Sequence, residues 1–264
     1  MSVFNINKRN HTTALAFLDP EGPVTLQRYE TLKYRQFDKL TDKQLGFFWR
    51  PEEVDVLRDS KDFKELTDYE QHIFTSNLKR QILLDSVQGR SPNLAFLPLC
   101  SLPELETWIQ TWAFNETIHS RSYTHIIRNV YGVPKDEFNK IHDTSEIAAM
   151  AASVGRYYED LHILNCRKEL GEDIPVYTHK RAIWLALHAS YALEALRFMV
   201  SFATSLAMVE NKIYIGNGNI ISLILQDEIL HSEWTAWLIN NVVKEDEDFL
   251  KLHKLYSNMV LHLN

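Results

Sequence analysis

The sequence is poor in the residues that break helices and in those that cross-link small folds. Glycine and proline number only eight each in 264 residues, and there are two cysteines, Cys100 and Cys166. Such scarcity of glycine and proline argues against a turn-rich β-sandwich and against a nucleotide-binding fold built on glycine loops. The two cysteines lack a CxxC spacing, so we expect reduced thiols in a cytoplasmic protein rather than a disulfide.

Basic charge is also in deficit, with 28 Lys and Arg against 35 Asp and Glu and a net charge of −7. This balance provides no basic surface for nucleic acid or an anionic membrane, and we expect neither as a direct partner. Residues 1–20 lack the continuous apolar stretch of a secretory signal. The most apolar long segment, 182–209, is interrupted by Glu194 and Arg197, whereas a bilayer span needs about 20 uncharged residues. We therefore interpret it as a core helix that holds something charged.

Apolar residues recur at helical spacing along most of the chain. They predict helices over about 24–48, 68–88, 101–130, 145–170, 178–208 and 219–243, with a short last helix after the acidic stretch KEDEDF. Thr67 and Glu70 form a predicted capping box, Thr178 and Asn219 are the expected N-caps of two later helices, and KIYIGNGN is an expected loop. The pattern predicts one all-α domain over 1–264, a bundle of long helices.

Two of the predicted helices contain the motif Glu-x-x-His, as Glu116 with His119 and Glu228 with His231. Side chains three residues apart lie about 60° apart around a helix, so each pair can bind one ion. A single such motif is common on a solvated face. Here both motifs have apolar neighbours at helical spacing, which indicates that they face a core: Trp108, Trp112 and Ile126 around Glu116, and Ile224 and Leu238 around Glu228.

Two further predicted helices each carry one carboxylate within an apolar stripe, Asp85 in QILLDSVQG and Glu194 in YALEALRF. Four carboxylates and two imidazoles from four helices match the ligand pattern of ferritin-like di-iron proteins. Four ionised carboxylates at ~6 Å would repel by about 3 kcal/mol per pair at an effective dielectric of ~20. Two divalent cations would remove this repulsion, and mixed oxygen and imidazole ligands suit iron or manganese. Without cations, some of these acids should stay protonated.

Tyr123 follows His119 by four residues and Glu116 by seven, so it lies on the same helix face. A tyrosine beside a redox-active metal pair can be oxidised to a phenoxyl radical if water is excluded. Phe198, Phe202 and Ile224 have the spacing to form such a dry wall. The equally weighted alternative is a core tyrosine whose hydroxyl is hydrogen-bonded.

Several long strings resemble the small (beta) subunit of class I ribonucleotide reductase, in the same order as in that family. They are FFWRPEEVDV, LLDSVQGRSPN, LETWIQTWAFNETIHSRSYTHIIRN, ALEALRF and QDEILH, and the match runs from about Pro23 to His231. The resemblance implies a ferritin-like bundle with two iron ions per chain, manganese being possible, and a tyrosyl radical at Tyr123. It implies one iron held by Asp85, Glu116 and His119, and a second held by Glu194, Glu228 and His231, with Glu116 bridging.

The same resemblance implies an electron path through Trp49, Asp227 and His119. It implies that the radical equivalent passes to a separate large subunit, which reduces ribonucleoside diphosphates to supply deoxyribonucleotides for DNA replication. It also implies a homodimer in the cytoplasm. The chain has no phosphate-binding glycine loop and no cysteine pair for the reduction, so it cannot perform the overall reaction alone.

The sequence departs from the family in several places. Family members continue for about a hundred further residues, including a peptide that binds the large subunit. We therefore expect a split or truncated small subunit whose missing part comes from a second polypeptide, with LYSNMVLHLN as the interface helix. Gln226 stands where Arg is common, Asn115 replaces Ser, and Tyr191 replaces Asn, which would place a second phenol on or near the metal face. For each of these, simple repacking is the favoured interpretation.

Three other functions compete with this interpretation. The first is iron storage or ferroxidase activity without a radical, which needs no path through Trp49 and Asp227. The second is a substrate-oxidising di-iron enzyme such as a desaturase or hydroxylase, a family that lacks the string Ser-Arg-Ser-Tyr-Thr-His. The third is an inactive fragment that only binds a partner, against which the complete set of six ligands argues.

Overall fold

The computed structural model describes residues 5, 11–24, 26–141 and 144–261 of the chain. Within these residues the fold is helical, and no β-strand is present. The helices are α1 (Arg35–Gly46), α2 (Leu57–Glu65), α3 (Asp68–Gln88), α4 (Ser91–Ala95), α5 (Pro103–Val130), α6 (Pro134–Asn139), α7 (Ser145–Glu169), α8 (Val176–Ala192), α9 (Phe198–Glu210), α10 (Ile215–Glu245) and α11 (Glu247–Leu261). Short helices η1 (Pro51–Glu53) and η2 (Leu97–Leu99) lie between them, and η4 (Leu193–Arg197) joins α8 to α9.

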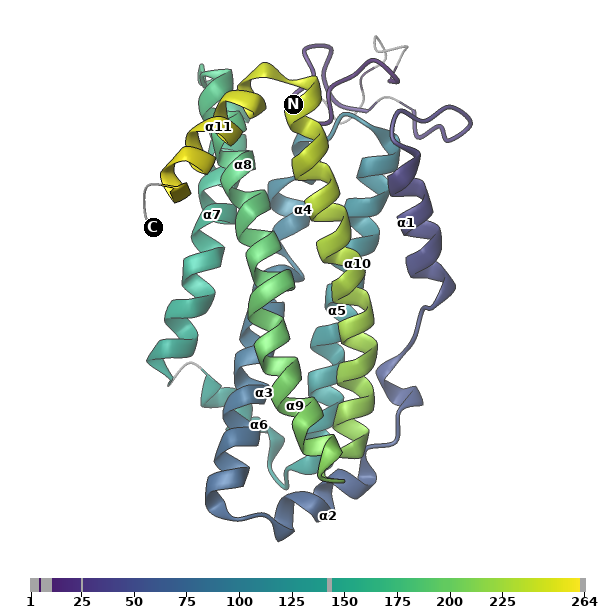
Figure 1. Cartoon of the computed structure of the whole chain (residues 1–264), viewed down its shortest axis with the longest axis vertical. Helices are drawn as coiled ribbons and strands as arrows, with labels where there is room; N and C mark the ends of the chain where they lie inside the picture. Colours follow the sequence, from purple (N-terminus) through teal and green to yellow (C-terminus); the bar gives the residue numbers. More distant parts are fainter. Residues whose placement is uncertain (1–4, 6–10, 25, 142–143, 262–264) are drawn as a thin grey trace.

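The long helices run side by side along the length of the molecule (Figure 1). Helices α3, α5 and α10, with the continuous rod of α8, η4 and α9, form the inner bundle, while α1 packs on α5 and α7 packs on α3 and α8. Helix α2 lies across one end, and α11 lies against α8 at the other. Buried apolar side chains form one continuous core through this bundle, which confirms the expected all-α architecture.

Local sequence signals set the start of α3 and the extent of α5 as expected. The Thr67 hydroxyl accepts a hydrogen bond from the Glu70 backbone, and the Glu70 carboxylate accepts one from the Thr67 backbone, so the predicted capping box is present. Helix α5 begins at Pro103, whose missing N–H costs nothing in a first turn, and ends at Val130. Helix α7 also has nearly the expected bounds.

Three predicted helix starts are wrong. The helix expected over 24–48 is formed only as α1, since the described residues between 24 and 34 form bends and irregular backbone. Within α1, Phe37 and Leu40 are buried, whereas Leu45 is 59% exposed. Helix α8 begins at Val176 after Pro175, so Thr178 lies inside the helix and does not cap it.

The start of α10 is set by tertiary contacts rather than by the expected cap Asn219. The Asp59 carboxylate of α2 accepts hydrogen bonds from the backbone N–H groups of Gly216 (3.1 Å) and Asn217 (2.6 Å). This contact lets the helix begin at Ile215, within the expected loop. Gly216 is required there because a Cβ would lie 2.5 Å from the backbone oxygen of Asp55.

The apolar rod Val176–Glu210 is, by length and composition alone, long and apolar enough to cross a membrane. Core helices pass the same test, and here the rod carries Glu194 on its buried side and packs against α3, α7 and α10. Around Glu194 it widens into a π-helical turn, η4. Such turns often occur at functional sites.

The last helix packs on its own chain through Phe249 and Leu252, which are buried. Only part of the segment LYSNMVLHLN can be compared with the expectation of an interface helix. Residues 262–264 and the side chains of 258–261 lie outside the described residues. No disulfide joins Cys100 and Cys166, as expected.

Candidate metal centre

The six predicted ligands come together at the middle of the inner bundle, and all of them are fully buried. Their ligating atoms form two overlapping groups, and within each group the atoms lie within 4.8 Å of one another. The groups are Asp85, Glu116, His119 and Glu228, and Glu116, Glu194, Glu228 and His231. Both Glu116 and Glu228 belong to both groups, whereas the sequence pointed to Glu116 alone as a bridge.

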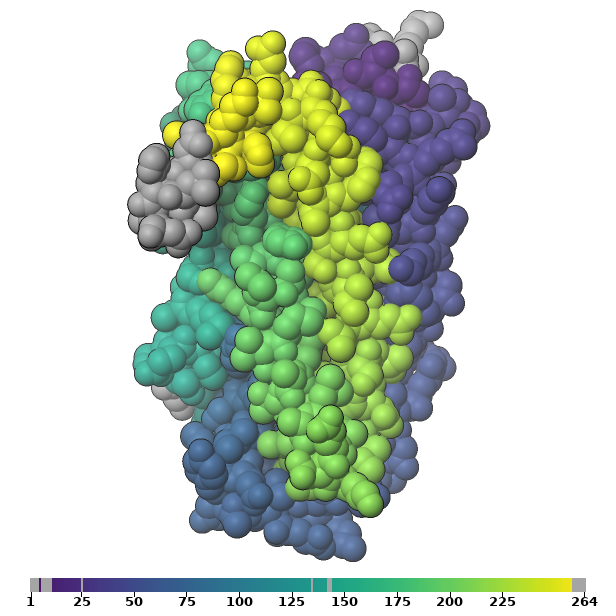
Figure 2. Space-filling model, viewed as in Figure 1, coloured from purple at the N-terminus to yellow at the C-terminus, as the bar shows by residue number. Residues whose placement is uncertain are grey.

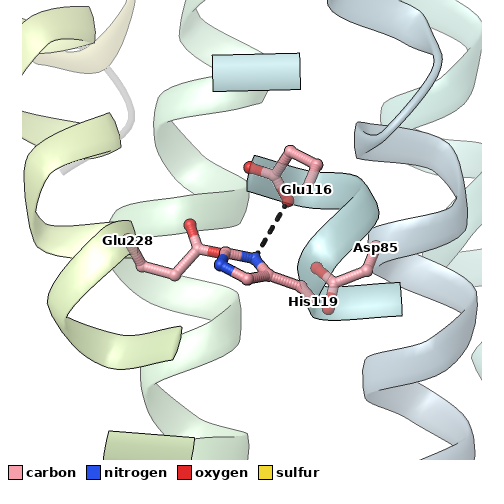
Figure 3. A group of neighbouring side chains, drawn as sticks. All are labelled: Asp85, Glu116, His119 and Glu228. Atoms are coloured by element: carbon pink, nitrogen blue, oxygen red, sulfur yellow. Dashed lines mark ion pairs between the residues drawn. The ribbon is translucent and has the colours of Figure 1, made fainter. Parts of the chain in front are cut away.

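The first of these groups is shown in Figure 3, where side chains from α3, α5 and α10 point toward one another. The Nδ1 atom of His119 lies 3.3 Å from Oε2 of Glu116 and 3.3 Å from Oε1 of Glu228. Nδ1 of His231 lies 3.0 Å from Oε1 of Glu116. On the face shown in Figure 2, the side chains of α9 and α10 lie side by side at the surface.

Many of the buried polar atoms in this cluster have no hydrogen-bond partner. They are both oxygens of Asp85 and of Glu228, one oxygen each of Glu116 and Glu194, Nδ1 of His119, and both ring nitrogens of His231. Buried polar atoms in native proteins are almost always satisfied. Oxygen and imidazole nitrogen atoms left over at one point are a donor set for divalent cations, so these residues fit a dinuclear metal site.

Burial and mutual repulsion keep part of the cluster protonated when no cation is present. Burial raises the pKa of Asp85, and the charge of Glu116 raises it further. Burial and the charge of Glu228 likewise raise the pKa of Glu194. These directions agree with the expectation that some of the acids would remain neutral without cations.

The pKa values of Glu116, His119 and His231 shift in the direction that favours their charged forms. Burial opposes the charged form of Glu116, but the close contacts with the rings of His119 and His231 outweigh it and lower its pKa to about 2. Burial also opposes the charged form of His231, yet Glu116 and Glu228 raise its pKa to about 10. The pKa of His119 is raised against burial by Asp227, Glu116 and Glu228.

A chain of hydrogen bonds leads from the cluster toward the edge of the bundle. Nε2 of His119 lies 3.0 Å from Oδ2 of Asp227, and the same oxygen accepts a hydrogen bond of 2.9 Å from Nε1 of Trp49. The structure therefore brings together the three residues expected to form the electron path. Sequence reasoning missed Gln44, whose amide donates to the other oxygen of Asp227 at 2.7 Å. Gln44 lies on α1, far from α10 in sequence, so no local pattern could pair them.

Tyr123 is fully buried, and its hydroxyl has no hydrogen-bond partner of normal geometry. Burial raises its pKa, and so does the charge of neighbouring Asp85. Asp85 lies close enough to act as a hydrogen-bond partner of this hydroxyl, so the radical role of Tyr123 and the alternative of a core tyrosine both stay predictions. Phe198, Phe202 and Ile224 are fully buried in the same apolar core, with the rings of Phe198 and Phe202 stacked at 5.7 Å.

Two tethers of ligand carboxylates were also missed. Nε1 of Trp112 donates to Glu116 at 2.9 Å. Nε2 of Gln88 donates to Glu194 at 2.5 Å, and Tyr158 donates to the amide oxygen of Gln88 at 3.0 Å. Trp112 lies four residues before Glu116 on α5, and Gln88 lies three residues after Asp85 on α3. This spacing could have placed both side chains beside the cluster.

The departures from the family pattern lie mostly away from the cluster. Tyr191 is 38% exposed, so the expectation of a second phenol near the metal face is wrong. Gln226 is exposed. Asn115 is buried and donates to the backbone oxygen of Thr111.

Comparisons with known proteins agree with this geometry. The family model for the ribonucleotide reductase small chain matches residues 27–261. The ribonucleoside-diphosphate reductase subunit beta of Buchnera aphidicola subsp. Baizongia pistaciae is 49% identical over 250 residues, which cover 90% of this chain and 66% of that protein. The subunit 1 beta of Escherichia coli O157:H7 is 50% identical over 229 residues, 83% of this chain and 61% of that protein. The chain therefore spans about two thirds or less of these relatives.

Solved structures share the fold at lower sequence identity. The R2 subunit from Clostridium botulinum aligns with a TM-score of 0.75 and 23% identity, covering 93% of this chain and 71% of that one. The dimanganese(II)-NrdF of Streptococcus sanguinis aligns with a TM-score of 0.73 and 18% identity, covering 89% and 78%. This chain thus has the ferritin-like fold of those proteins.

Proposed function

Since this chain belongs to the ribonucleotide reductase small-chain family, we propose that it generates and holds the radical used by a ribonucleoside-diphosphate reductase. The single observation that carries the proposal is a continuous chain of hydrogen bonds from Trp49 through Asp227 to His119. His119 is also one of the candidate metal ligands, so the chain connects the metal cluster to Trp49. Iron storage needs no such connection between a metal cluster and an aromatic side chain.

In this proposal, Asp85, Glu116 and His119 hold one metal ion, and Glu194, Glu228 and His231 hold the other, with Glu116 and Glu228 close to both. When bound and reduced, the metal pair supplies electrons to dioxygen and an oxidising equivalent for the nearby tyrosine. The protein neutralises the two cations with four carboxylates in a site that water does not reach.

Tyr123 is the residue that we propose is oxidised, by loss of one electron and its hydroxyl proton. Its hydroxyl has no hydrogen bond of normal geometry, and it lies close enough to Asp85 for that carboxylate to raise its pKa. Asp85 is therefore the base that we propose accepts the proton. Complete burial beside Phe198, Phe202 and Ile224 would keep reductants and water from the radical.

Transfer of the radical equivalent would use the three path residues. The Trp49 and His119 rings lie 6.4 Å apart, nearly parallel, and both contact the same oxygen of Asp227. The second oxygen of Asp227 is held by Gln44, so the carboxylate cannot turn away from the two rings. This arrangement fixes the ring tautomer of His119, because Nε2 must carry the proton that faces Asp227.

The test is spectroscopic. The chain is loaded anaerobically with ferrous iron, oxygen is admitted, and the EPR spectrum is recorded. We expect about two iron ions per chain and a tyrosyl signal that Tyr123→Phe abolishes without changing the iron content. Tyr214→Phe is the matched control, because Tyr214 is equally buried and its hydroxyl also lacks a partner. Iron uptake without any radical in the unaltered chain would favour storage or an inactive fragment instead.

The remaining expectations belong to the same proposal. We propose iron as the metal, with manganese as the alternative, a cytoplasmic location, a homodimer, and a large subunit that binds and reduces the ribonucleoside diphosphate.

A further inference from the structure

The carboxylate of Glu194 is held by a chain of buried hydrogen bonds to side chains that are not candidate metal ligands. These are Gln88 on α3, Ser190 on α8 and Tyr158 on α7. Nε2 of Gln88, at the end of α3, donates to Oε1 of Glu194 at 2.5 Å and to the Ser190 hydroxyl at 3.2 Å. The hydroxyl of Tyr158, on α7, donates to Oε1 of Gln88 at 3.0 Å. Gln88, Ser190 and Glu194 are fully buried, and Tyr158 is 3% exposed.

The direction of each hydrogen bond in this relay is fixed by chemistry. When Glu194 binds a metal ion it is ionised and can only accept, so in that state the amide of Gln88 must turn its NH₂ group to Glu194. The amide oxygen must then face Tyr158, whose hydroxyl is the donor there. Tyr158 thus determines which end of the amide meets the ligand, although it touches neither the carboxylate nor the cluster.

The two oxygens of Glu194 are used differently as a result. Oε1 is occupied by Gln88, whereas Oε2 has no partner among the described residues. Asp85, the single carboxylate at the opposite end of the cluster, has no partner on either oxygen. The tether therefore acts at one end of the cluster only.

We infer that Gln88 and Tyr158 are positioning residues that hold Glu194 by one oxygen and leave the other to bind a metal ion. This inference rests on the proposed role of Glu194 as a ligand. Because Glu194 belongs only to the group with Glu116, Glu228 and His231, loss of the tether weakens one metal position and spares the position formed around Asp85.

The experiment is a titration of the 264-residue chain with Mn²⁺, with free Mn²⁺ measured by its EPR signal at room temperature. Gln88→Met keeps the length of the side chain but removes the amide. Its matched control is Gln81→Met, since Gln81 lies seven residues earlier on the same helix and is equally buried. Tyr158→Phe removes one hydroxyl, and Tyr214→Phe removes the hydroxyl of another buried tyrosine.

We expect the unaltered chain to bind two Mn²⁺ ions. In Gln88→Met, one of the two dissociation constants should rise by about 10- to 100-fold while the other is unchanged, as is typical for loss of a group that orients a ligand. Tyr158→Phe should weaken the same position by a smaller factor. The EPR signal of an exchange-coupled manganese pair should need correspondingly more metal to form in both variants.

Three results would overturn the inference, and they separate it from the proposed function. If the unaltered chain binds no Mn²⁺, both fail. If it binds two ions and Gln88→Met binds them equally well, the tether has no role and the metal site stands. If Gln81→Met and Gln88→Met weaken both positions alike, the effect is structural. Should Gln88→Met fail to fold by circular dichroism, Tyr158→Phe alone decides the question.

Discussion

Loading the cluster with metal should release several protons, and their number follows from the structure. Without cations, burial and neighbouring charge raise the pKa of Asp85 and Glu194, which favours their neutral forms. The pKa values of His119 and His231 are also raised, that of His231 to about 10, so both rings are protonated. A metal ion needs ionised carboxylates and neutral imidazoles. Binding of two divalent cations near pH 6 should therefore release about four protons.

The same four groups set the direction of the pH dependence. Protons compete with metal at Asp85, Glu194, His119 and His231, so metal affinity rises with pH. The overall association constant for two ions should rise by up to about four powers of ten per pH unit. The assay is an anaerobic titration with Fe²⁺ or Mn²⁺ in weak buffer containing a pH indicator. Glu194→Gln is the control, because the amide mimics the neutral acid and should reduce the release by about one proton. Release of one proton or fewer by the unaltered chain would refute the reasoning.

Three further predictions concern residues around the cluster. Trp49→Phe removes the donor to Asp227 and should leave metal content unchanged while abolishing nucleotide reduction with the large subunit, as metal analysis and a turnover assay would reveal. Asp59→Ala removes the cap of α10 and should lower the free energy of unfolding in urea by about 1–2 kcal/mol; an unchanged midpoint would contradict the assigned cap. Burial lowers the pKa of His179 to about 4. Its contribution to the free energy of unfolding is therefore complete above pH 6.5 and falls by up to about 3 kcal/mol as the pH drops toward 4. In His179→Gln, the free energy of unfolding in urea should depend less on pH over this range, and an equally steep dependence would contradict the assignment.

The convergence of the six candidate ligands could be predicted from sequence because its signals are local. Glu116 and His119 share one helix face by their spacing, and carboxylates such as Asp85 and Glu194 are conspicuous within apolar stripes. The capping box at Thr67 could be predicted for the same reason, since both partners lie within one turn.

The features that sequence reasoning missed depend on contacts between distant segments. Asp59 begins α10 from more than 150 positions away in the chain, and no pattern near Gly216 reveals this. Tyr158 acts on Glu194 through Gln88, so three helices must be placed before the relay can be seen. The spacing of three residues between Tyr191 and Glu194 predicted a shared helix face, but the packing of the neighbouring helices leaves Tyr191 38% exposed.

We propose that two cations bind side by side between Glu116 and Glu228. Anomalous diffraction from crystals soaked in Mn²⁺ would locate them. We expect two adjacent peaks, one nearest Asp85 and His119 and the other nearest Glu194 and His231, with Glu116 in contact with both. A single peak, or metal bound only at the surface of the bundle, would contradict it.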